Sequence, residues 1–488
     1  MSFVSLTFLL FLPLVFAFHW MGRSAKQQNL VLVIASYFFY GWWDWRFCGL
    51  MLLSTMIDYT LGLLLGATEG EGKRRALLTI SIVANLTVLG IFKYCNFFLD
   101  NVTGALGALG WHLDAFTLNV VLPVGISFYT FQTLSYTIDV YRRQLEPSRN
   151  LIEYLAFVSF FPQLVAGPIE RATNLLPQFK GCREFDSEFA TSGLKFMLYG
   201  VIKKLLIADR LAVIVDDLYG NHAAQSGPML MLATVFFAFQ IYCDFSAYSD
   251  IARGTARLFS IRLIRNFDYP YFSTSLSEFW RRWHISLSSW FRDYVYIPLG
   301  GSRCAPWKRS CNLLLTFLLS GVWHGAAWTF VVWGALQGVF LELTFRQKQI
   351  EAPVGKYSLA SASLFRAKVF GRMMMTFGIV CLGWVFFRSE SMGQAIGILG
   401  QIVVDALNPH AWQASFGEVF GDKLLKRATL ILCGFVAFEW WNRVRECPLE
   451  GLAGMPVALR WAAYTGLLWG LFYLLPTTGS QQFIYFDF

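Results

Sequence analysis

Long apolar runs separated by short polar segments recur along most of the chain. In the first part of the chain each run carries at most one charged side chain; these runs are residues 3–18, 29–43, 47–65, 76–99 and 116–140. A helix of about 20 apolar residues crosses a hydrocarbon layer of roughly 30 Å, so runs of this kind predict membrane spans. Backbone groups in lipid must bond within their own segment, and the runs are too continuous for barrel strands. We therefore expect an all-α polytopic membrane protein.

The middle of the chain is less regular. Residues 151–169 are apolar but interrupted by Pro162, Gly167 and Pro168, so we expect a re-entrant or kinked segment there. The run 189–218 holds more charge than a lipid-facing span tolerates, and we expect its charged side chains to face a cavity or the cytosolic surface. They include Lys203, Lys204, Asp209 and Arg210.

Further apolar runs close the chain at 369–387, 424–441 and 457–475, with a shorter stretch at 395–406. Together the pattern predicts about eleven or twelve transmembrane crossings. We find no internal repeat and no separate soluble part, so we expect one integral-membrane domain over residues 1–488.

The composition supports this class. Hydrophobic residues make up 56%, aromatic residues 17% and charged residues 15% of the chain, and the mean hydropathy is +0.48. The net charge of +9 does not indicate nucleic acid, because the basic residues are scattered at the ends of apolar runs. The nine cysteines show no CxxC pair and no spacing to histidine suited to zinc, so we expect neither a metal site nor a disulfide framework.

The basic residues also predict an orientation. Arg23 and Lys26 follow the first run, which lacks a basic start and a clear cleavage site and is therefore interpreted as a retained span. The positive-inside rule places this loop in the cytoplasm and the N-terminus outside. Residues 100–114 contain no Lys or Arg and should be external, and by the same count residues 481–488 should lie outside.

One histidine falls within an apolar run. Residues 313–345 contain no Asp, Lys or Arg and one Glu, Glu342, so the run predicts a span with His324 near its middle. An ionisable residue inside the membrane is a candidate functional residue. The alternative is a histidine that merely bonds a neighbouring helix or a backbone carbonyl.

A second histidine lies in an amphipathic segment. At helical spacing one face holds Trp280, Trp283, His284, Leu287 and Phe291, and the flanks hold Arg281, Arg282, Ser289 and Arg292. We expect a helix in the membrane interface that tilts His284 inward. The alternative is a basic helix that anchors to lipid headgroups and carries an ordinary interfacial histidine.

An acidic segment follows the apolar run 229–242. Asp244 and Tyr248 are four residues apart, hence on one helical face, where they could bond each other or share a pocket. The alternative is a helix end that meets water, with Asp244 bonded structurally.

Several blocks in this order resemble the membrane-bound O-acyltransferase family, and within it the bacterial branch that acts in alginate O-acetylation. Residues 243–252 are similar to that branch's DFSGYSDIA block, with Ala247 where glycine is usual. Residues 278–287 are similar to its FWRRWHISLS block and residues 294–303 to its YIPLGGSR block. Residues 323–328 are similar to its WHGxxW block. The strong resemblance covers residues 122–338 approximately.

The resemblance implies a fold and a site. The fold would be a ring of about eleven or twelve tilted helices, with re-entrant and amphipathic helices, around a central funnel that opens to the cytosol. Within it we assign N-terminal spans to 1–120, a catalytic core to 121–345 and C-terminal spans to 346–488. His324 would carry the catalytic histidine, and His284 the second functional polar position.

The resemblance also implies that the chain is an O-acyltransferase of the bacterial cytoplasmic membrane. Its acyl donor would be acetyl-CoA, with no bound cofactor. The acceptor would lie outside the cytoplasm and belong to an exopolysaccharide, with alginate first. Since CoA stays in the cytosol, the acetyl group would cross the protein to an extracytoplasmic SGNH-type acetyltransferase subunit.

The residues around His324 suit this chemistry. Burial lowers the basicity of an imidazole, so a neutral His324 could take a proton from a hydroxyl group. Gly321 and Gly325 would let the donor approach the backbone closely, or they serve helix packing. Trp323 and Trp328 either wall the tunnel or fill lipid-facing space. The phosphates of CoA would be attracted by basic residues, although each of these also fits the positive-inside rule; the candidates are Arg281, Arg282, Arg303, Lys308 and Arg309.

Other functions remain open on the sequence. The same chemistry could serve peptidoglycan, cellulose or the D-alanylation of teichoic acid. An intramembrane Asp244 and His324 would also suit a transporter or channel, which would not cleave a thioester. A nonenzymatic scaffold would tolerate replacement of His324.

Overall fold

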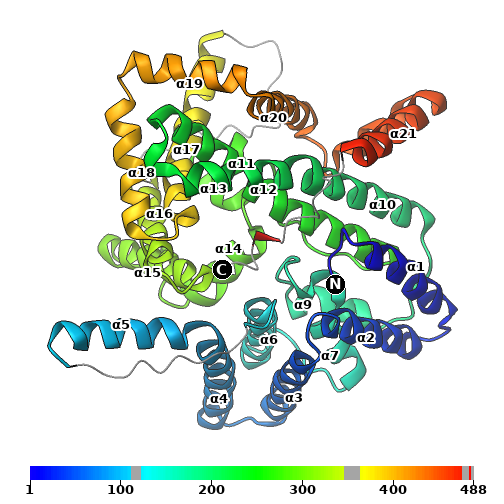
Figure 1. Ribbon diagram of the computed structural model, residues 1–488. Coiled ribbons are helices and arrows are strands. Elements are labelled where there is room, and N and C mark those ends of the chain that lie inside the picture. The colour runs from blue at the N-terminus through cyan, green and yellow to red at the C-terminus, as the bar shows by residue number, and fades with distance from the viewer. Residues whose placement is uncertain (112–121, 346–362, 475–482, 485–488) are drawn as a thin grey trace. The chain divides into compact units, whose positions relative to one another are not determined.

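The computed structural model describes residues 1–111, 122–345, 363–474 and 483–484. The regular elements of these residues are helices, which confirms the predicted all-α class (Figure 1). They form two compact units, one of Met1–Met197 with Ile251–Ile264 and the other of Leu198–Asp250 with Arg265–Phe488. The division of one domain at 120 and 345 stays a prediction.

The first unit contains the helices up to the start of α10, together with the end of α12. They are α1 (Leu6–Met21), α2 (Ala25–Gly41), α3 (Arg46–Ala67), α4 (Glu71–Leu89), η1 (Gly90–Tyr94), α5 (Cys95–Ala108), α6 (Ile126–Tyr141), α7 (Leu151–Ser159), α8 (Phe161–Leu164), α9 (Ala172–Leu175), η2 (Leu176–Phe179), α10 (Ser187–Ile202) and α12 (Gly227–Leu258).

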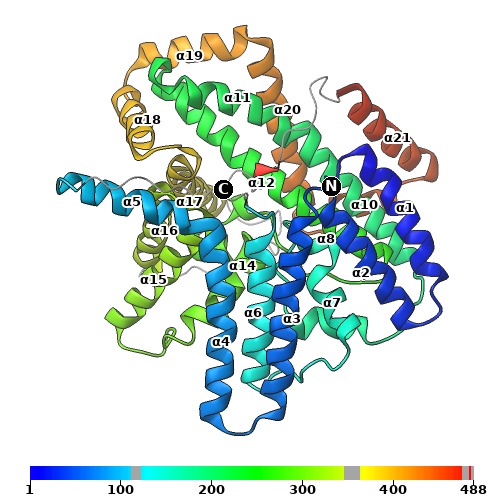
Figure 2. The same cartoon turned by 60° about the horizontal axis from the view of Figure 1, so that its bottom comes forward.

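A buried polar cluster joins three of these helices, α3, α4 and α6, which lie side by side (Figure 2). The carboxylate of Asp58 accepts hydrogen bonds from Ser81 Oγ at 2.6 Å and from Asn85 Nδ2 at 2.8 Å. Thr133 and Thr137 on α6 extend the cluster to Asn85 and Ser81. Polar side chains inside apolar helices need such partners, and the cluster therefore fixes how the three helices pack.

One predicted boundary of this unit is corrected and another is confirmed. The run 76–99 does not end in a loop at residue 100, because the helix continues through a π-helical turn at η1 and α5 reaches Ala108. Residues 112–114 of the predicted loop lie outside the described residues, as does the start of the run 116–140. The break in 151–169 is confirmed: α7 ends at Ser159, and Pro162 lies in the first turn of the short α8.

The second unit carries the cavities described below. Besides the rest of α10 and α12 it contains η3 (Lys203–Ala208), α11 (Asp209–Gly220), η4 (His222–Ala224), η5 (Pro270–Phe272), α13 (Leu276–Arg282), α14 (Ile285–Phe291), η6 (Arg292–Tyr296), α15 (Pro306–His324), α16 (Trp328–Phe345), α17 (Ser363–Arg388), α18 (Met392–Asp405), α19 (Pro409–Gly421), α20 (Lys423–Asn442), η7 (Pro448–Gly454) and α21 (Val457–Leu474).

The apolar run 313–345 is a helical hairpin rather than one span, so the prediction of a single crossing was wrong. α15 ends at His324, three residues turn, and α16 begins at Trp328. Gly321 packs against Phe330 and Gly334, whereas Gly338 packs against Leu314, so the two helices run antiparallel. The turn places His324 at the tip of the hairpin.

Four described helices are long and apolar enough to cross a membrane: Arg46–Ala67, Glu71–Ala108, Gly227–Leu258 and Ala367–Arg388. Shorter apolar helices occur at Leu6–Met21, Trp328–Thr344 and Met392–Asp405. The count of eleven or twelve crossings stays a prediction. The predicted external placement of residues 481–488 falls almost wholly outside the described residues.

Candidate active site

A cavity of about 400 Å³ in the second unit is lined by both candidate histidines. Its walls come from α13, α14, α15 and α16, so residues 40 positions apart in the sequence meet at one space. Its inner part is aromatic, with Trp280, Trp283 and Phe317 in the lining. His284 is 1% exposed and His324 4% exposed. The two histidines that the sequence singled out therefore lie at the same cavity.

The ring of His324 lies in an aromatic cage. It meets Trp323 at 5.0 Å, Trp333 at 5.0 Å and Phe387 at 5.2 Å between ring centroids, each in an edge-on arrangement. Phe387 and Trp333 also meet each other at 5.3 Å. These rings cover much of the imidazole and shield that part of it from water.

His284 interrupts the predicted amphipathic helix, which is two short helices instead of one. α13 ends at Arg282, and His284 adopts a left-handed backbone with φ 42° and ψ 54° before α14 begins. Its Nδ1 accepts a hydrogen bond from the Leu287 N–H at 3.4 Å, so His284 caps α14. His284 lies outside the candidate spans, and burial lowers the pKa of its imidazole to about 3, which keeps it neutral at pH 7.

Asn266 holds this turn in place, a role that the sequence did not indicate. Its backbone oxygen accepts the Ile285 N–H at 2.9 Å, and its Oδ1 accepts the Ser286 N–H at 3.2 Å and the Ser286 hydroxyl at 2.9 Å. Its Nδ2 donates to Ser249 Oγ on α12 at 3.2 Å. Asn266 is 1% exposed, so these bonds are shielded from water. The buried amide therefore ties His284 to the long helix α12.

Basic residues line the outer part of the cavity. Arg281 is exposed there, Arg292 pairs with Asp293 at 2.7 Å, and Arg309 pairs with Glu342 at 3.0 Å. Of the predicted CoA-binding residues, Arg281 and Arg309 thus lie at the cavity.

The other three predicted basic residues do not line it. Arg282 is engaged with Glu278 at 2.8 Å and with the Asp268 carbonyl, which makes it structural. Arg303 and Lys308 are exposed near the start of α15.

The glycines beside His324 serve helix packing rather than donor access. A Cβ at Gly321 would collide with the Phe330 carbonyl oxygen, and a Cβ at Gly325 would collide with the Phe330 ring. Neither glycine lines the cavity. Neither of the two tryptophans lines a cavity: Trp323 is buried against both histidine rings, and Trp328 is 56% exposed. Trp328 therefore matches the space-filling alternative.

A second cavity of about 630 Å³ borders the aromatic cage at Phe387. Phe387 and Phe330 form part of its wall, and polar residues form much of the rest. Lys204 Nζ bridges Asp209 at 2.8 Å and Asp244 at 2.7 Å inside it. Of the charged residues in the segment 189–218, Lys204, Asp209 and Asp216 thus face a cavity, which is one of the two placements predicted for such charges.

Asp244 and Tyr248 both contact the segment 483–484. Asp244 Oδ2 accepts the Ile484 N–H at 2.7 Å, and the Tyr248 ring packs on Phe483 at 4.9 Å. A shared substrate pocket for the two residues stays a prediction. Ile484 also lines the second cavity. The helix-end alternative was wrong, because α12 continues to Leu258.

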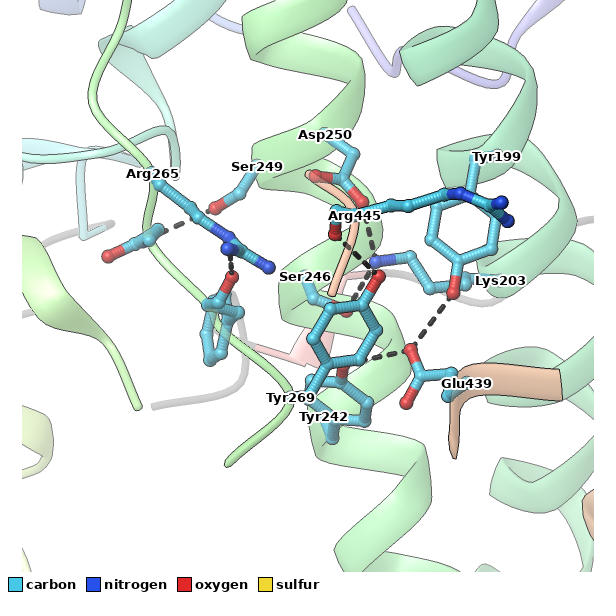
Figure 3. A network of polar contacts seen from close by, with 12 residues as sticks. Tyr199, Lys203, Tyr242, Ser246, Ser249, Asp250, Arg265, Tyr269, Glu439 and Arg445 are labelled. Carbon is cyan, nitrogen blue, oxygen red and sulfur yellow. Dashed lines mark hydrogen bonds and ion pairs between the residues drawn. The ribbon is translucent and has the colours of Figure 1, made fainter. Parts of the chain in front are cut away.

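Lys203 lines neither cavity and instead joins a buried network that the sequence did not reveal (Figure 3). Its Nζ donates to Ser246 Oγ and to Asp250 Oδ2, both at 2.7 Å. Glu439 on α20 accepts the hydroxyls of Tyr199 and Tyr242, both at 2.9 Å. The π-helical turn η3 thus directs two adjacent lysines to two different acidic groups on α12.

The arrangement is suited to general-base chemistry on a donor that carries negative charge. A buried neutral imidazole can accept a proton from a hydroxyl, and the arginines attract anions to the outer part of the first cavity. Among the described residues no group of three or more His, Cys, Asp or Glu could hold a metal ion. The prediction of no metal site stays a prediction.

An all-helical chain with apolar spans and two buried histidines at one cavity defines a multi-pass membrane protein with an enzyme-like site. Comparison with known sequences identifies the family of this membrane protein. The chain belongs to the membrane-bound O-acyltransferase family, which it matches over residues 32–385. It is therefore a membrane O-acyltransferase.

Three relatives show how far the similarity extends. The chain is 41% identical to the probable alginate O-acetylase AlgI of Azotobacter vinelandii, over 81% of this chain and 76% of that protein. It is 32% identical to the peptidoglycan O-acetyltransferase of Helicobacter pylori, over 80% and 78%. It is 26% identical to the teichoic acid D-alanyltransferase of Bacillus subtilis, over 56% and 70%.

Proposed function

We propose that this protein takes an acetyl group from cytosolic acetyl-CoA and passes it across the membrane for the O-acetylation of an exopolysaccharide, with alginate as the polymer. The observation that carries the proposal is that His324 lines the cavity with arginines in its outer wall and also contacts Phe387, which walls the second cavity. The 41% identity to the probable alginate O-acetylase supports the choice of polymer.

The chemistry follows from this placement. The thioester of acetyl-CoA occupies the inner part of the first cavity, with its phosphates at Arg281 and Arg309. His324 accepts the proton of the attacking hydroxyl while the oxygen forms a bond to the acetyl carbonyl carbon. The bond from that carbon to sulfur then breaks, and His324 returns the proton to the CoA thiolate. His284, held by Asn266, is the second polar group within reach of the reacting carbonyl.

The proposed setting is the bacterial cytoplasmic membrane, in the predicted ring of helices and with the N-terminus outside. The basic residues of the first cavity then face the cytosol, where CoA is found. The second cavity faces outward, where an extracytoplasmic acetyltransferase subunit receives the acetyl group and transfers it to sugar.

The test follows acetyl groups with purified protein and in cells. Purified protein in detergent or nanodiscs is incubated with labelled acetyl-CoA and assayed for free CoA, and cells are assayed for acetyl groups on each envelope polymer. His324→Ala should abolish both signals, and His410→Ala, an exposed histidine on α19, should abolish neither. Normal polymer acetylation in His324→Ala cells would overturn the proposal, and solute flux without thioester cleavage would favour a transporter.

The relative from H. pylori favours one second candidate, the O-acetylation of peptidoglycan. The polymer analysis separates the two. Loss of acetyl groups from muropeptides in His324→Ala cells, with alginate unaffected or absent, would replace the exopolysaccharide by peptidoglycan without changing the chemistry.

A further inference from the structure

Phe387 contacts the candidate base and also lines the second cavity. It is the penultimate residue of α17 and is 1% exposed. Its ring meets the His324 imidazole edge-on at 5.2 Å. The same residue forms part of the wall of the second cavity. Phe387 therefore stands next to both the histidine of the first cavity and the space of the second.

The ring is held firmly from three directions. Phe330 meets it at 4.9 Å, Trp333 at 5.3 Å and Trp384 at 5.3 Å. Phe330 is itself seated against Gly325, where a Cβ would collide with its ring. Since packed aromatic cores resist small displacements, the ring of Phe387 forms a fixed constriction beside His324 and does not swing aside.

A fixed constriction limits the size of the group that can lie beside His324. An acyl group whose carbonyl carbon reaches the imidazole has its remaining carbons directed at the surrounding rings. A methyl group requires little space there, whereas each additional methylene must displace one of the rings or go elsewhere. Hydrophobic pockets discriminate one methylene by about tenfold or more when the extra carbon does not fit.

We propose that Phe387 is a specificity-determining residue, which restricts the transferred acyl group to two carbons by narrowing the space between the two cavities next to His324. The proposal rests on the proposed acetyl transfer. It assigns to this side chain the rejection of propionyl and butyryl thioesters, whose chains would extend into the second cavity if the ring were absent.

The test compares acyl-CoA substrates within one preparation. Purified wild-type protein, Phe387→Leu and Phe387→Ala are assayed for CoA release from acetyl-, propionyl- and butyryl-CoA. The ratio of kcat/KM for butyryl-CoA to that for acetyl-CoA does not depend on the fraction of folded protein, so partial misfolding of a variant does not alter it. We expect the ratio to rise about tenfold or more in Phe387→Ala and less in Phe387→Leu.

Phe377→Leu is the matched control. Phe377 lies on the same helix but packs against Phe239 and Tyr271, so the ratio should stay at the wild-type value. An unchanged ratio in Phe387→Ala and Phe387→Leu would overturn the inference and leave the proposed function intact. A wild-type protein that releases no CoA from acetyl-CoA would overturn the proposed function and the inference with it.

Discussion

The close contact between α15 and α16 predicts a strong effect of a single added methyl group. Gly321 and Gly334 face each other across the hairpin. A Cβ built at Gly321 collides with the Phe330 carbonyl oxygen and comes within 3.2 Å of Gly334 Cα. The reciprocal Cβ at Gly334 collides with the Phe317 carbonyl oxygen. Backbone atoms cannot rotate away as a flexible side chain would, so Gly321→Ala must push the helices apart.

The magnitude can be estimated from two opposing effects. Overpacking of a tight interface costs about 1–3 kcal/mol. Replacing glycine by alanine in a helix returns roughly 1 kcal/mol, because alanine restricts the unfolded chain. We therefore expect a net loss of about 0–2 kcal/mol in the free energy of unfolding. The rate of CoA release should fall by about a hundredfold. His324 ends the same helix three residues after Gly321, and a displacement of a reacting group by about 1 Å lowers the rate by roughly that factor.

The assay combines stability and turnover. Thermal unfolding of the detergent-solubilised protein is followed by tryptophan fluorescence, and CoA release from acetyl-CoA is measured below the transition. Gly378→Ala is the matched control, because it lies inside α17 and its Cβ would meet nothing within 4 Å. It should keep or slightly raise the melting temperature. Wild-type stability and activity in Gly321→Ala would refute the close-packing argument and restore the alternative that the glycine serves the donor.

Two further predictions concern buried polar groups. Asn266→Ala removes the amide that bonds Ser286 and Ser249, so His284 loses its support. The kcat for CoA release should fall about tenfold or more, while KM for acetyl-CoA stays near the wild-type value. A loss that reflects only a smaller amount of folded protein would contradict the positioning role. Lys204→Met leaves Asp209 and Asp244 buried without their shared cation. The free energy of unfolding should fall by about 3–5 kcal/mol, and the melting temperature should fall with it. The triple variant Lys204→Met, Asp209→Asn, Asp244→Asn should recover most of this stability, and no recovery would show that the ion pairs are not the cause.

The sequence pattern predicted much of the helical layout because burial in lipid imposes long apolar runs. α2, α3 and α20 lie close to the predicted runs 29–43, 47–65 and 424–441. The same pattern could not reveal the hairpin at His324. Hydropathy averages over many residues, and the turn of small residues between α15 and α16 is as apolar as the helices beside it.

The polar networks were beyond sequence reasoning for a different reason. Lys204 pairs with Asp244 across 40 positions, and Tyr199 bonds Glu439 across 240. Helical periodicity identifies which residues share a face, but it carries no information on which distant helix covers that face. The charges of 189–218 could therefore be assigned to a cavity or surface, whereas their partners could not be named.

The two histidines reach one cavity because both stand where a helix ends. A side chain inside a regular helix points at fixed angles to its neighbours, but a residue at a terminus can be turned independently of them. His324 is the last residue of α15, and His284 is the cap of α14 with φ 42°, a conformation that costs a non-glycine residue about 1–2 kcal/mol. Such strain persists only where the surroundings enforce it, and here Asn266 supplies three of the enforcing bonds. The continuous amphipathic helix predicted from the sequence would avoid this strain. Since the helix nevertheless breaks at His284, we infer that the position of the His284 ring, rather than the stability of the segment, determines the local structure.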